Sequence, residues 1–273
     1  MRFAICNETF QDWPLPRAFA FARECGYEGV EIAPFTIAHD VKDISPARRA
    51  EVRDMAADDG LEVIGLHWLL AKTQGYHLTS PDAAIRKATT EYLKELARCC
   101  REMGGSLLVF GSPAQRNVPD GVSMDEAMCY AAEVFRGAMP VLAEHEVTLA
   151  IEPLSPKDGN FLLTAADGVK LMKMVDHPNC RLHLDCKAMS SESKPIPQLI
   201  RENIQHLVHF HANDANLQGP GFGEIDFVPI FQTLHDVGYD GWVSVEVFDY
   251  SPGVERLARE SIEYMKECEG KVT

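Results

Sequence analysis

The sequence has no CxxC pair among its eight cysteines, no apolar run near the roughly 18 residues of a membrane span, and no signal-peptide pattern at its start. A chain of 273 residues, 46% of them hydrophobic, can bury a core that needs no disulfides. We therefore expect buried thiols in a reducing compartment, and a cytoplasmic protein that does not insert into a membrane.

Positive charge is also scarce. The chain has 26 lysines and arginines against 41 aspartates and glutamates, which gives a formal net charge of −15. Nucleic acids and anionic membrane surfaces are bound through basic patches. We therefore predict neither a nucleic-acid partner nor a membrane partner.

A nucleotide-binding GxGxxG motif is absent after the first predicted strand. Instead, short apolar strands alternate with longer segments that have helical start and stop signals. We predict eight strands, at about residues 2–6, 29–33, 61–69, 106–110, 148–152, 181–185, 207–211 and 242–246. Eight parallel strands alternating with helices can close into a barrel, which needs about 250 residues. We predict a single (β/α)8 TIM barrel domain over residues 1–273, of the α/β class, with an open doubly wound sheet as the competitor.

Several helix starts can be placed from capping residues. We predict them at Ser45, Ser80, Ser123, Thr164 and Asp226, because Ser, Thr and Asp are favoured N-caps. The segment 186–194 is predicted to be a polar loop.

Four predicted strands end in a residue that can bind a metal ion. In three of these strands, apolar side chains occupy one face, and Glu152, Asp185 or Glu246 lies on the opposite face. His211 ends the strand before the last one. The four are spaced by about one strand-plus-helix unit. Barrel enzymes carry their chemistry at the carboxyl ends of the strands, so we expect these side chains to meet at one point.

Three carboxylates in one pocket raise one another's pKa unless a cation is present. A divalent metal ion removes this conflict. Two glutamates, one aspartate and one imidazole form an oxygen-rich set, which favours Mn²⁺, with Mg²⁺, Co²⁺ and Zn²⁺ as alternatives. We predict that Glu152, Asp185, His211 and Glu246 are the metal ligands.

Five further residues are candidates for substrate contact. His183 and His209 lie one step deeper on the same strand faces, Glu31 and His67 point inward by parity, and Lys187 follows shortly after Asp185. Each can bind the substrate or orient a residue that does. The alternatives are a hydrogen-bonded core side chain or, for Lys187, a solvated loop lysine.

Four short motifs resemble a known family: Ile151-Glu152-Pro153-Leu154, His183-Leu184-Asp185, His209-Phe210-His211 and Val245-Glu246. They are similar to motifs of the sugar phosphate isomerase/epimerase family, also called xylose isomerase-like TIM barrels, which includes the ketose 3-epimerases. The resemblance implies that the four predicted ligands hold the metal and that Glu152 and Glu246 are also the catalytic acid/base pair. It also implies a small-molecule sugar or polyol substrate and a homo-oligomer, a dimer or a tetramer.

The chain departs from the ketose 3-epimerases at three positions. They carry a histidine where this chain has Ala188 and an arginine where it has Leu217, and both family residues help to hold the oxygens of the substrate. Asp158 stands where those enzymes use a glutamate, and the resemblance therefore makes it a candidate substrate contact.

The implied activity interconverts ketoses, or an aldose and a ketose, through an enediolate. One glutamate removes a proton from carbon and the other returns a proton, while a metal ion acts as a Lewis acid. A dehydratase or lyase that acts on a keto-sugar or keto-inositol begins with the same proton and is the alternative enzyme. A sugar-binding protein without catalytic activity is a further alternative.

Two large aromatic residues, Trp68 and Phe248, lie near predicted strand ends. They can stack on the face of a sugar ring, although packing is the more common role. The glycine-rich segment 219–223 precedes Asp226, whose charge disfavours an anion at the start of the next helix. We predict a tight turn or a lid there rather than a phosphate-binding loop.

Overall fold

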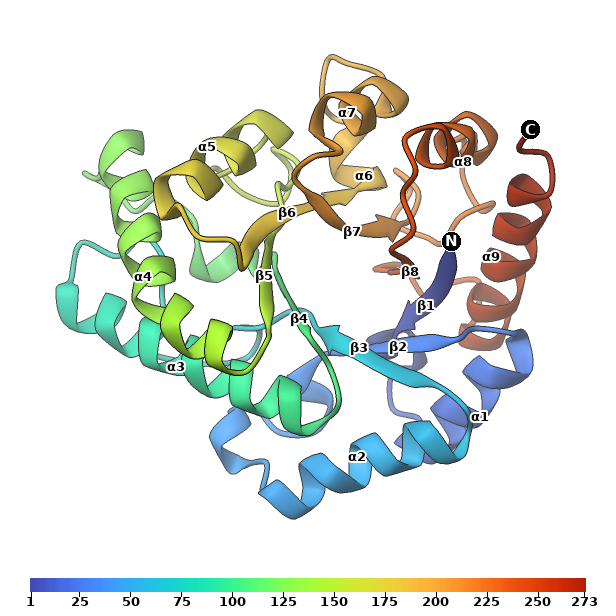
Figure 1. Cartoon of the computed structure of the whole chain (residues 1–273), viewed down its shortest axis with the longest axis horizontal. Coiled ribbons are helices and arrows are strands. Elements are labelled where there is room, and N and C mark those ends of the chain that lie inside the picture. The colour runs from blue at the N-terminus through green and yellow to red at the C-terminus, as the bar shows by residue number, and fades with distance from the viewer.

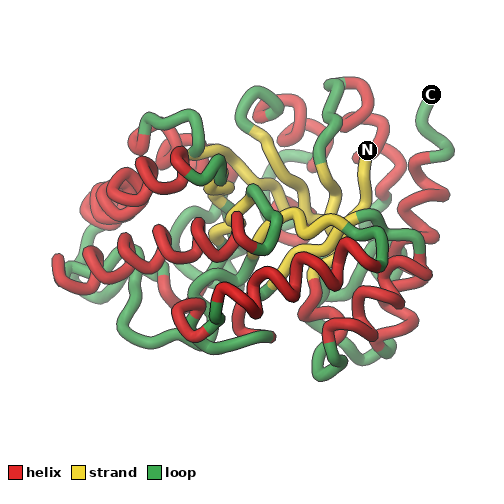
Figure 2. The backbone as a smooth tube through the Cα atoms, turned by 60° about the horizontal axis from the view of Figure 1, so that its bottom comes forward, coloured by secondary structure: helices red, strands yellow, loops and turns green.

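The computed structural model describes all residues from 1 to 273. Eight parallel strands close into a barrel in the order of the sequence, and β1 pairs with both β2 and β8 (Figures 1 and 2). The strands are β1 (Arg2–Cys6), β2 (Gly29–Ile32), β3 (Glu62–Leu66), β4 (Leu107–Phe110), β5 (Thr148–Ile151), β6 (Cys180–Asp185), β7 (Leu207–Ala212) and β8 (Trp242–Val245). The predicted barrel is confirmed, and the open sheet is excluded by the β1–β8 pairing.

The helices surround the barrel, and the α1 and α9 helices lie side by side where the two ends of the chain meet (Figure 1). They are α1 (Leu15–Cys25), α2 (Pro46–Asp58), α3 (Ala83–Glu102), α4 (Met124–Glu144), α5 (Ala165–Val175), α6 (Cys186–Met189), α7 (Ile196–Asn203), α8 (Phe227–Asp236) and α9 (Val254–Glu269). Short 3-10 helices follow the strands at η1 (Asn7–Phe10), η2 (Pro34–Thr36), η3 (Val41–Asp43) and η4 (Pro113–Gln115).

Four of the five predicted N-caps are confirmed. The side chains of Ser45, Ser123, Thr164 and Asp226 each accept a hydrogen bond from a backbone N–H in the first turn of α2, α4, α5 and α8. The prediction for α3 was wrong by two residues, because Asp82 caps that helix by accepting from the Ala84 N–H.

Two other boundaries also differ from the prediction. The third strand ends at Leu66, before the predicted residue 69, because Trp68 has a φ of 51° and cannot continue an extended strand. The segment 186–194, predicted as a polar loop, begins with the short helix α6. The Asp185 side chain caps α6 by accepting from the Ala188 N–H.

The main hydrophobic core fills the layer between the barrel and the helices, where residues such as Ile5, Leu182 and Phe210 are buried. The interior of the barrel is different, because it carries buried polar side chains, among them Glu31 and His209. Buried polar groups need partners, and Glu31 and His209 are partners of each other. None of the helices combines the length and the apolar character that crossing a membrane requires.

Candidate metal centre and pocket

The four predicted metal ligands gather at the carboxyl ends of four adjacent strands. Glu152 follows β5, Asp185 ends β6, His211 lies in β7 and Glu246 follows β8, and all four are buried. Candidate ligand atoms of Glu152, Asp185, His211 and the neighbouring His183 all lie within 4.8 Å of one another. Glu246 joins them through His211, whose Nδ1 atom is 3.0 Å from Glu246 Oε2. The structure therefore brings the predicted set together.

Glu152 has the least compensated carboxylate of the group. No side chain or backbone N–H donates a hydrogen bond to it, and burial, together with the charges of Glu246 and Asp185, raises its pKa well above the usual value. Gly111 makes room for it, since a Cβ atom at that position would collide with Glu152 Oε2. A buried carboxylate without a donor, in a space kept free by glycine, is what a cation would complete.

Asp185 is held more firmly. Its Oδ1 atom accepts from the Ala188 N–H at 2.7 Å, and its Oδ2 atom accepts from the Asn213 side-chain amide at 2.5 Å. Burial and the nearby Glu246 nevertheless raise its pKa to about 6. These hydrogen bonds fix the carboxylate in place while leaving lone pairs on both oxygens for a further contact.

His211 lies between two carboxylates. Its Nδ1 atom is 3.0 Å from Glu246 Oε2, and its Nε2 atom is 3.0 Å from Glu31 Oε2. Burial alone would lower the pKa of His211, but the two glutamates raise it well above the usual value. If the Glu246 contact were replaced by a metal ion, Glu31 could still accept from Nε2 and leave Nδ1 free to bind the ion.

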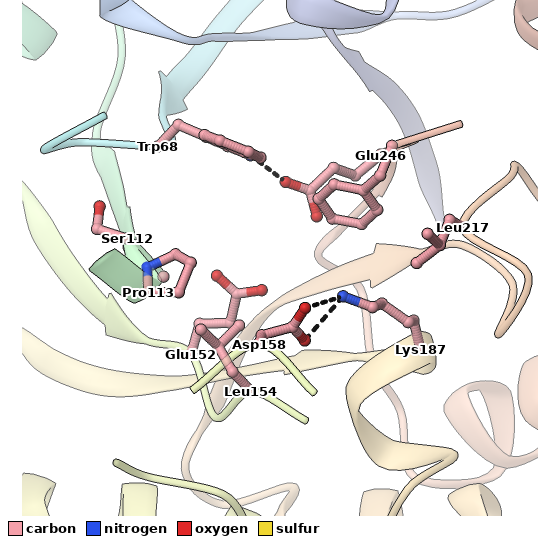
Figure 3. Close-up of a pocket in the computed structure, with 11 residues that line it drawn as sticks. Trp68, Ser112, Pro113, Glu152, Leu154, Asp158, Lys187, Leu217 and Glu246 are labelled. Carbon is pink, nitrogen blue, oxygen red and sulfur yellow. Dashed lines mark hydrogen bonds and ion pairs between the residues drawn. The ribbon is translucent and has the colours of Figure 1, made fainter. Parts of the chain in front are cut away.

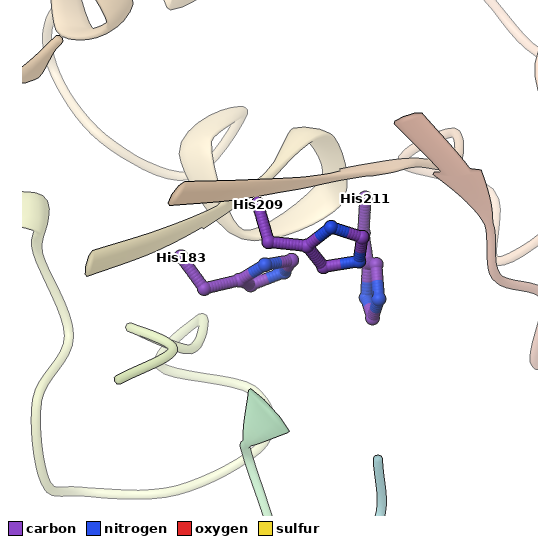
Figure 4. Close-up of side chains that lie close together, drawn as sticks. All are labelled: His183, His209 and His211. Atoms are coloured by element: carbon purple, nitrogen blue, oxygen red, sulfur yellow. The ribbon is translucent and has the colours of Figure 1, made fainter. Parts of the chain in front are cut away.

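His183 is the clearest sign that the group is incomplete. It is fully buried, and neither of its ring nitrogens has a hydrogen-bond partner. Figure 4 shows its ring beside those of His209 and His211, and the ring centroids of His183 and His211 are 4.2 Å apart. Burial lowers the pKa of His183 well below the usual value, which favours the neutral form of this imidazole. Together with the three carboxylates and His211, it makes a donor set that fits a divalent metal ion.

Glu31 and His209 lie one layer deeper than the metal-type residues. Both are fully buried, and Glu31 Oε2 is 2.8 Å from His209 Nε2. Burial would raise the pKa of Glu31, but His209 and His211 lower it well below the usual value. Neither residue lines the pocket that contains Glu152 and Glu246. Their position therefore favours a role in orienting His211 over direct contact with a substrate.

His67 has a partner that the sequence did not reveal. Its Nε2 atom is 2.6 Å from Oε2 of Glu8, a residue of η1 that is also buried. Candidate ligand atoms of Cys6, Glu8, His67 and Glu246 lie within 4.8 Å of one another, so this pair borders the metal-type group. His67 does not line the pocket either.

A pocket of about 160 Å³, here called the inner pocket, opens at this end of the barrel (Figure 3). Glu152 and Glu246 stand on opposite walls of it. Trp68 lines it and donates from Nε1 to Glu246 Oε1 at 2.9 Å, so both oxygens of Glu246 are held. The ring of Phe248 lies beside that of Trp68, with centroids 6.1 Å apart, and forms another wall.

Asp158 and Lys187 meet at the rim of the inner pocket. The Nζ atom of Lys187 is 2.8 Å from each carboxylate oxygen of Asp158, and it also lies 4.6 Å from the centre of the Phe248 ring. Burial opposes ionisation of Asp158, but hydrogen bonds from Lys187 and Ser155 lower its pKa. The two residues are half-buried and line the pocket. Lys187 is therefore paired in the free protein rather than solvated.

Three contributors to the site lie outside the sequence predictions. Glu8 pairs with His67, Asn213 orients Asp185, and the buried Arg116 donates to the carbonyl oxygens of Glu152, Phe161 and Leu162. Only Asn213 had a recognisable signal, since it stands two residues after His211 in the same strand-end segment. Glu8 and Arg116 come from short irregular segments, where neither strand parity nor helical period applies.

Comparison with known proteins connects this geometry to a family. Residues 19–268 match the family model described as the xylose isomerase-like TIM barrel. A probable ketose 3-epimerase of Synechocystis is 25% identical over 91% of this chain and 89% of its own length. A D-psicose 3-epimerase of Agrobacterium fabrum is 29% identical over 82% of this chain and 75% of its own length.

The fold has solved counterparts. The crystal structure of D-psicose 3-epimerase with D-tagatose from Clostridium cellulolyticum superposes with a TM-score of 0.87 at 22% identity, covering 98% of this chain and 99% of that one. At this identity the superposition establishes the shared barrel alone.

Proposed function

Because the chain belongs to the xylose isomerase-like TIM barrel family, we propose that it is a divalent-metal-dependent sugar isomerase or epimerase. One observation carries the proposal: Glu152 and Glu246 face each other across the inner pocket, within a group that also contains Asp185 and His211. The relatives named as ketose 3-epimerases support the same reaction class.

The two glutamates supply the proton chemistry. A carboxylate on one wall can remove the proton from the carbon next to a carbonyl, and a carboxyl group on the opposite wall can return a proton to the other face or to the neighbouring carbon. Positioned proton transfer of this kind typically contributes about 10²- to 10⁴-fold to the rate. A divalent ion held by Glu152, Asp185, His211 and Glu246 would supply Lewis-acid stabilisation of the negative charge that develops on the substrate oxygens.

Other residues hold the glutamates and the sugar in position. Trp68 and His211 hydrogen-bond the two oxygens of Glu246 and so fix the direction of that carboxylate. We assign Glu31 and His209 to the orientation of His211, and Asp158 and Lys187 to the hydroxyl groups of the sugar at the pocket rim. For His183 and His67, we propose contact with the ligand set from below the pocket.

We propose Mn²⁺ as the working metal, since the ligand set is rich in oxygen and has at most two imidazoles. We propose one domain over residues 1–273, because the first and last strands pair to close the ring.

We also propose a location and an assembly state. The eight free thiols support a cytoplasmic location, and the resemblance to ketose 3-epimerases supports a dimer or a tetramer. The net charge of −15 supports a small-molecule partner over nucleic acid or an anionic membrane surface.

A screen in D₂O tests the proposal. The Mn²⁺-loaded protein is incubated with ketoses, aldoses and keto-inositols, and each sugar is recovered and analysed by NMR. We expect deuterium at the carbon next to the carbonyl in at least one sugar, together with a new epimer or isomer. Loss of a hydroxyl group with formation of a double bond would instead identify a dehydratase. Tight binding of a sugar without any deuterium uptake would identify a binding protein and refute the proposal.

A further inference from the structure

The inner pocket shares part of its lining with a larger space, here called the outer chamber. The outer chamber has a volume of about 790 Å³ and is bounded by the loop after β5, the end of α6 and the loop after β7. Three residues line both spaces and form their shared boundary: Asp158, Lys187 and Leu217. The inner pocket lies below the roughly 300–1,000 Å³ typical of drug-sized ligands, and the outer chamber lies within it.

Leu217 is the one uncharged residue of this shared boundary. It is 40% exposed and has a φ of 74°, a conformation that a leucine rarely adopts. Its carbonyl oxygen holds this conformation by accepting from the N–H groups of Phe248 and Asp249 at 2.8 Å each. An exposed apolar side chain kept in a strained conformation beside a pocket points to a ligand that packs on it.

The outer chamber also carries three serine hydroxyl groups, and each of them already donates a hydrogen bond within the protein. Ser190 Oγ donates to the Lys187 carbonyl, Ser191 Oγ donates to the Ala188 carbonyl, and Ser155 Oγ donates to Asp158 Oδ2, all at 2.7 Å. Ser190 and Ser191 therefore offer lone pairs, which accept hydrogen bonds from hydroxyl groups.

The outer chamber offers few free hydrogen-bond donors or cations to an anionic group. A phosphate needs several donors, but the Lys187 ammonium group is already paired with both oxygens of Asp158. Lys157 is the one cation of the lining that has no ion-pair partner, and it is exposed. A lining that combines hydroxyl acceptors with the apolar side chains of Pro156, Ala215 and Leu217 matches a sugar ring, which has hydroxyl groups at its edge and C–H groups on its faces.

We propose that the outer chamber binds a second sugar ring, so that the substrate is a keto-sugar carrying a glycosyl substituent. This inference deepens the proposed function and rests on it for the reaction at the first ring. The reacting keto-sugar occupies the inner pocket between Glu152 and Glu246. The glycosyl group extends past Leu217 and lies against Ser190 and Ser191.

A matched ligand series tests the chamber by calorimetry on the full-length, Mn²⁺-loaded protein. The series is D-fructose, isomaltulose, which carries a glucosyl group on O6, lactulose, which carries a galactosyl group on O4, and fructose 6-phosphate. We expect at least one disaccharide to bind with a Kd about tenfold or more below that of fructose. Equal Kd values for fructose and both disaccharides, or tightest binding of fructose 6-phosphate, would overturn the proposal.

A variant locates the second ring. Ala215 lines the outer chamber with an exposed methyl group and takes no part in the inner pocket. We expect Ala215→Trp to fill the chamber and remove the preference for the disaccharide, while the Kd of fructose changes less than about twofold. The matched control is Ala20→Trp, an exposed position on α1, which should leave all Kd values unchanged. A disaccharide preference that survives Ala215→Trp in a folded protein would also overturn the proposal.

Failure of the chamber and failure of the proposed function give different results. A disaccharide preference lost in Ala215→Trp, without deuterium uptake from D₂O by any sugar, would retain the chamber and refute the enzyme activity. If fructose takes up deuterium from D₂O as efficiently as both disaccharides do, the result would retain the activity and refute the chamber. Absence of binding by every sugar would refute both.

Discussion

The Nδ1 atom of His211 lies 3.0 Å from Oε2 of Glu246. The two residues come from neighbouring strands, and both belong to the predicted ligand set. The contact links Glu246 to the group formed by Glu152, Asp185 and His183. It also explains why Glu246 is better stabilised than Glu152, since His211 and the indole N–H of Trp68 lower the pKa of Glu246 against the effect of its burial. The two glutamates therefore differ in environment before any ligand binds.

Removal of either carboxylate should stop the reaction without unfolding the barrel. We expect Glu152→Gln and Glu246→Gln to lower kcat by at least about 10²- to 10⁴-fold, because each removes a positioned proton donor or acceptor. Turnover is measured on the sugar identified by the D₂O screen, and folding is checked by circular dichroism. Near wild-type kcat in either variant would show that the acid/base assignment is wrong.

Removal of the metal should inactivate the protein reversibly. We expect EDTA to abolish deuterium exchange and Mn²⁺ or Co²⁺ to restore it, because Lewis-acid stabilisation is lost and regained. Elemental analysis of the same samples gives the metal content of each state. Full activity in a sample shown to be free of metal would contradict the role of the ion.

In the metal-free protein, the contribution of Asp185 and Glu152 to stability should fall as the pH rises. The folded-state pKa of Asp185 is raised from 3.8 to about 6, and that of Glu152 is raised as well. A carboxyl group with a raised folded pKa contributes stability that is complete below its unfolded pKa and is lost as the pH rises through its folded pKa. For Asp185 this window runs from pH 3.8 to about 6.

A neutral isostere makes this effect measurable. In EDTA at pH 7 to 8, we expect Glu152→Gln to have a higher Tm than the wild type, because one repelling charge has been removed. In Mn²⁺ the order should reverse, since the variant has lost a ligand. Thermal melting of both proteins at pH 4 to 8, with and without Mn²⁺, checks the prediction, and an unchanged order of Tm values in the two conditions would count against it.

Glu31 should be a major contributor to stability. Its carboxylate is the partner of both His209 and His211, and all three side chains are fully buried. We expect Glu31→Ala to lower the free energy of unfolding by about 3–5 kcal/mol, because two buried imidazoles lose their partner. The control is Glu255→Ala, which breaks an exposed pair with Arg17 and should cost less than about 1 kcal/mol. Equal effects in urea unfolding would show that the buried network contributes little.

The barrel, and the convergence of the four proposed ligand side chains at one end of it, could be predicted because both depend on local periodicity. Alternation along each strand places Glu152, Asp185 and Glu246 on the inner face, and parallel strands bring their carboxyl ends to one edge. Helix starts at Ser123 and Thr164 depend only on a capping residue and the next turn. These signals span a few residues, so the sequence is enough to read them.

The supporting contacts could not be predicted in the same way. The Glu8–His67 pair joins η1 to the end of β3, and the Glu31–His209 pair crosses the barrel from β2 to β7. Parity indicates that Glu31 and His67 point inward, but it does not say which partner each will meet. The left-handed conformations of Trp68 and Leu217, which both line the inner pocket, occur at residue types that do not favour them.

Anomalous X-ray diffraction from crystals grown with Mn²⁺ tests the central claim most directly, because it locates the metal without assuming any substrate. We predict one strong manganese peak per chain, within coordination distance of Glu152, Asp185, His211 and Glu246. Absence of a peak at this end of the barrel in a fully Mn²⁺-loaded sample, or a peak bound by other side chains, would contradict the account.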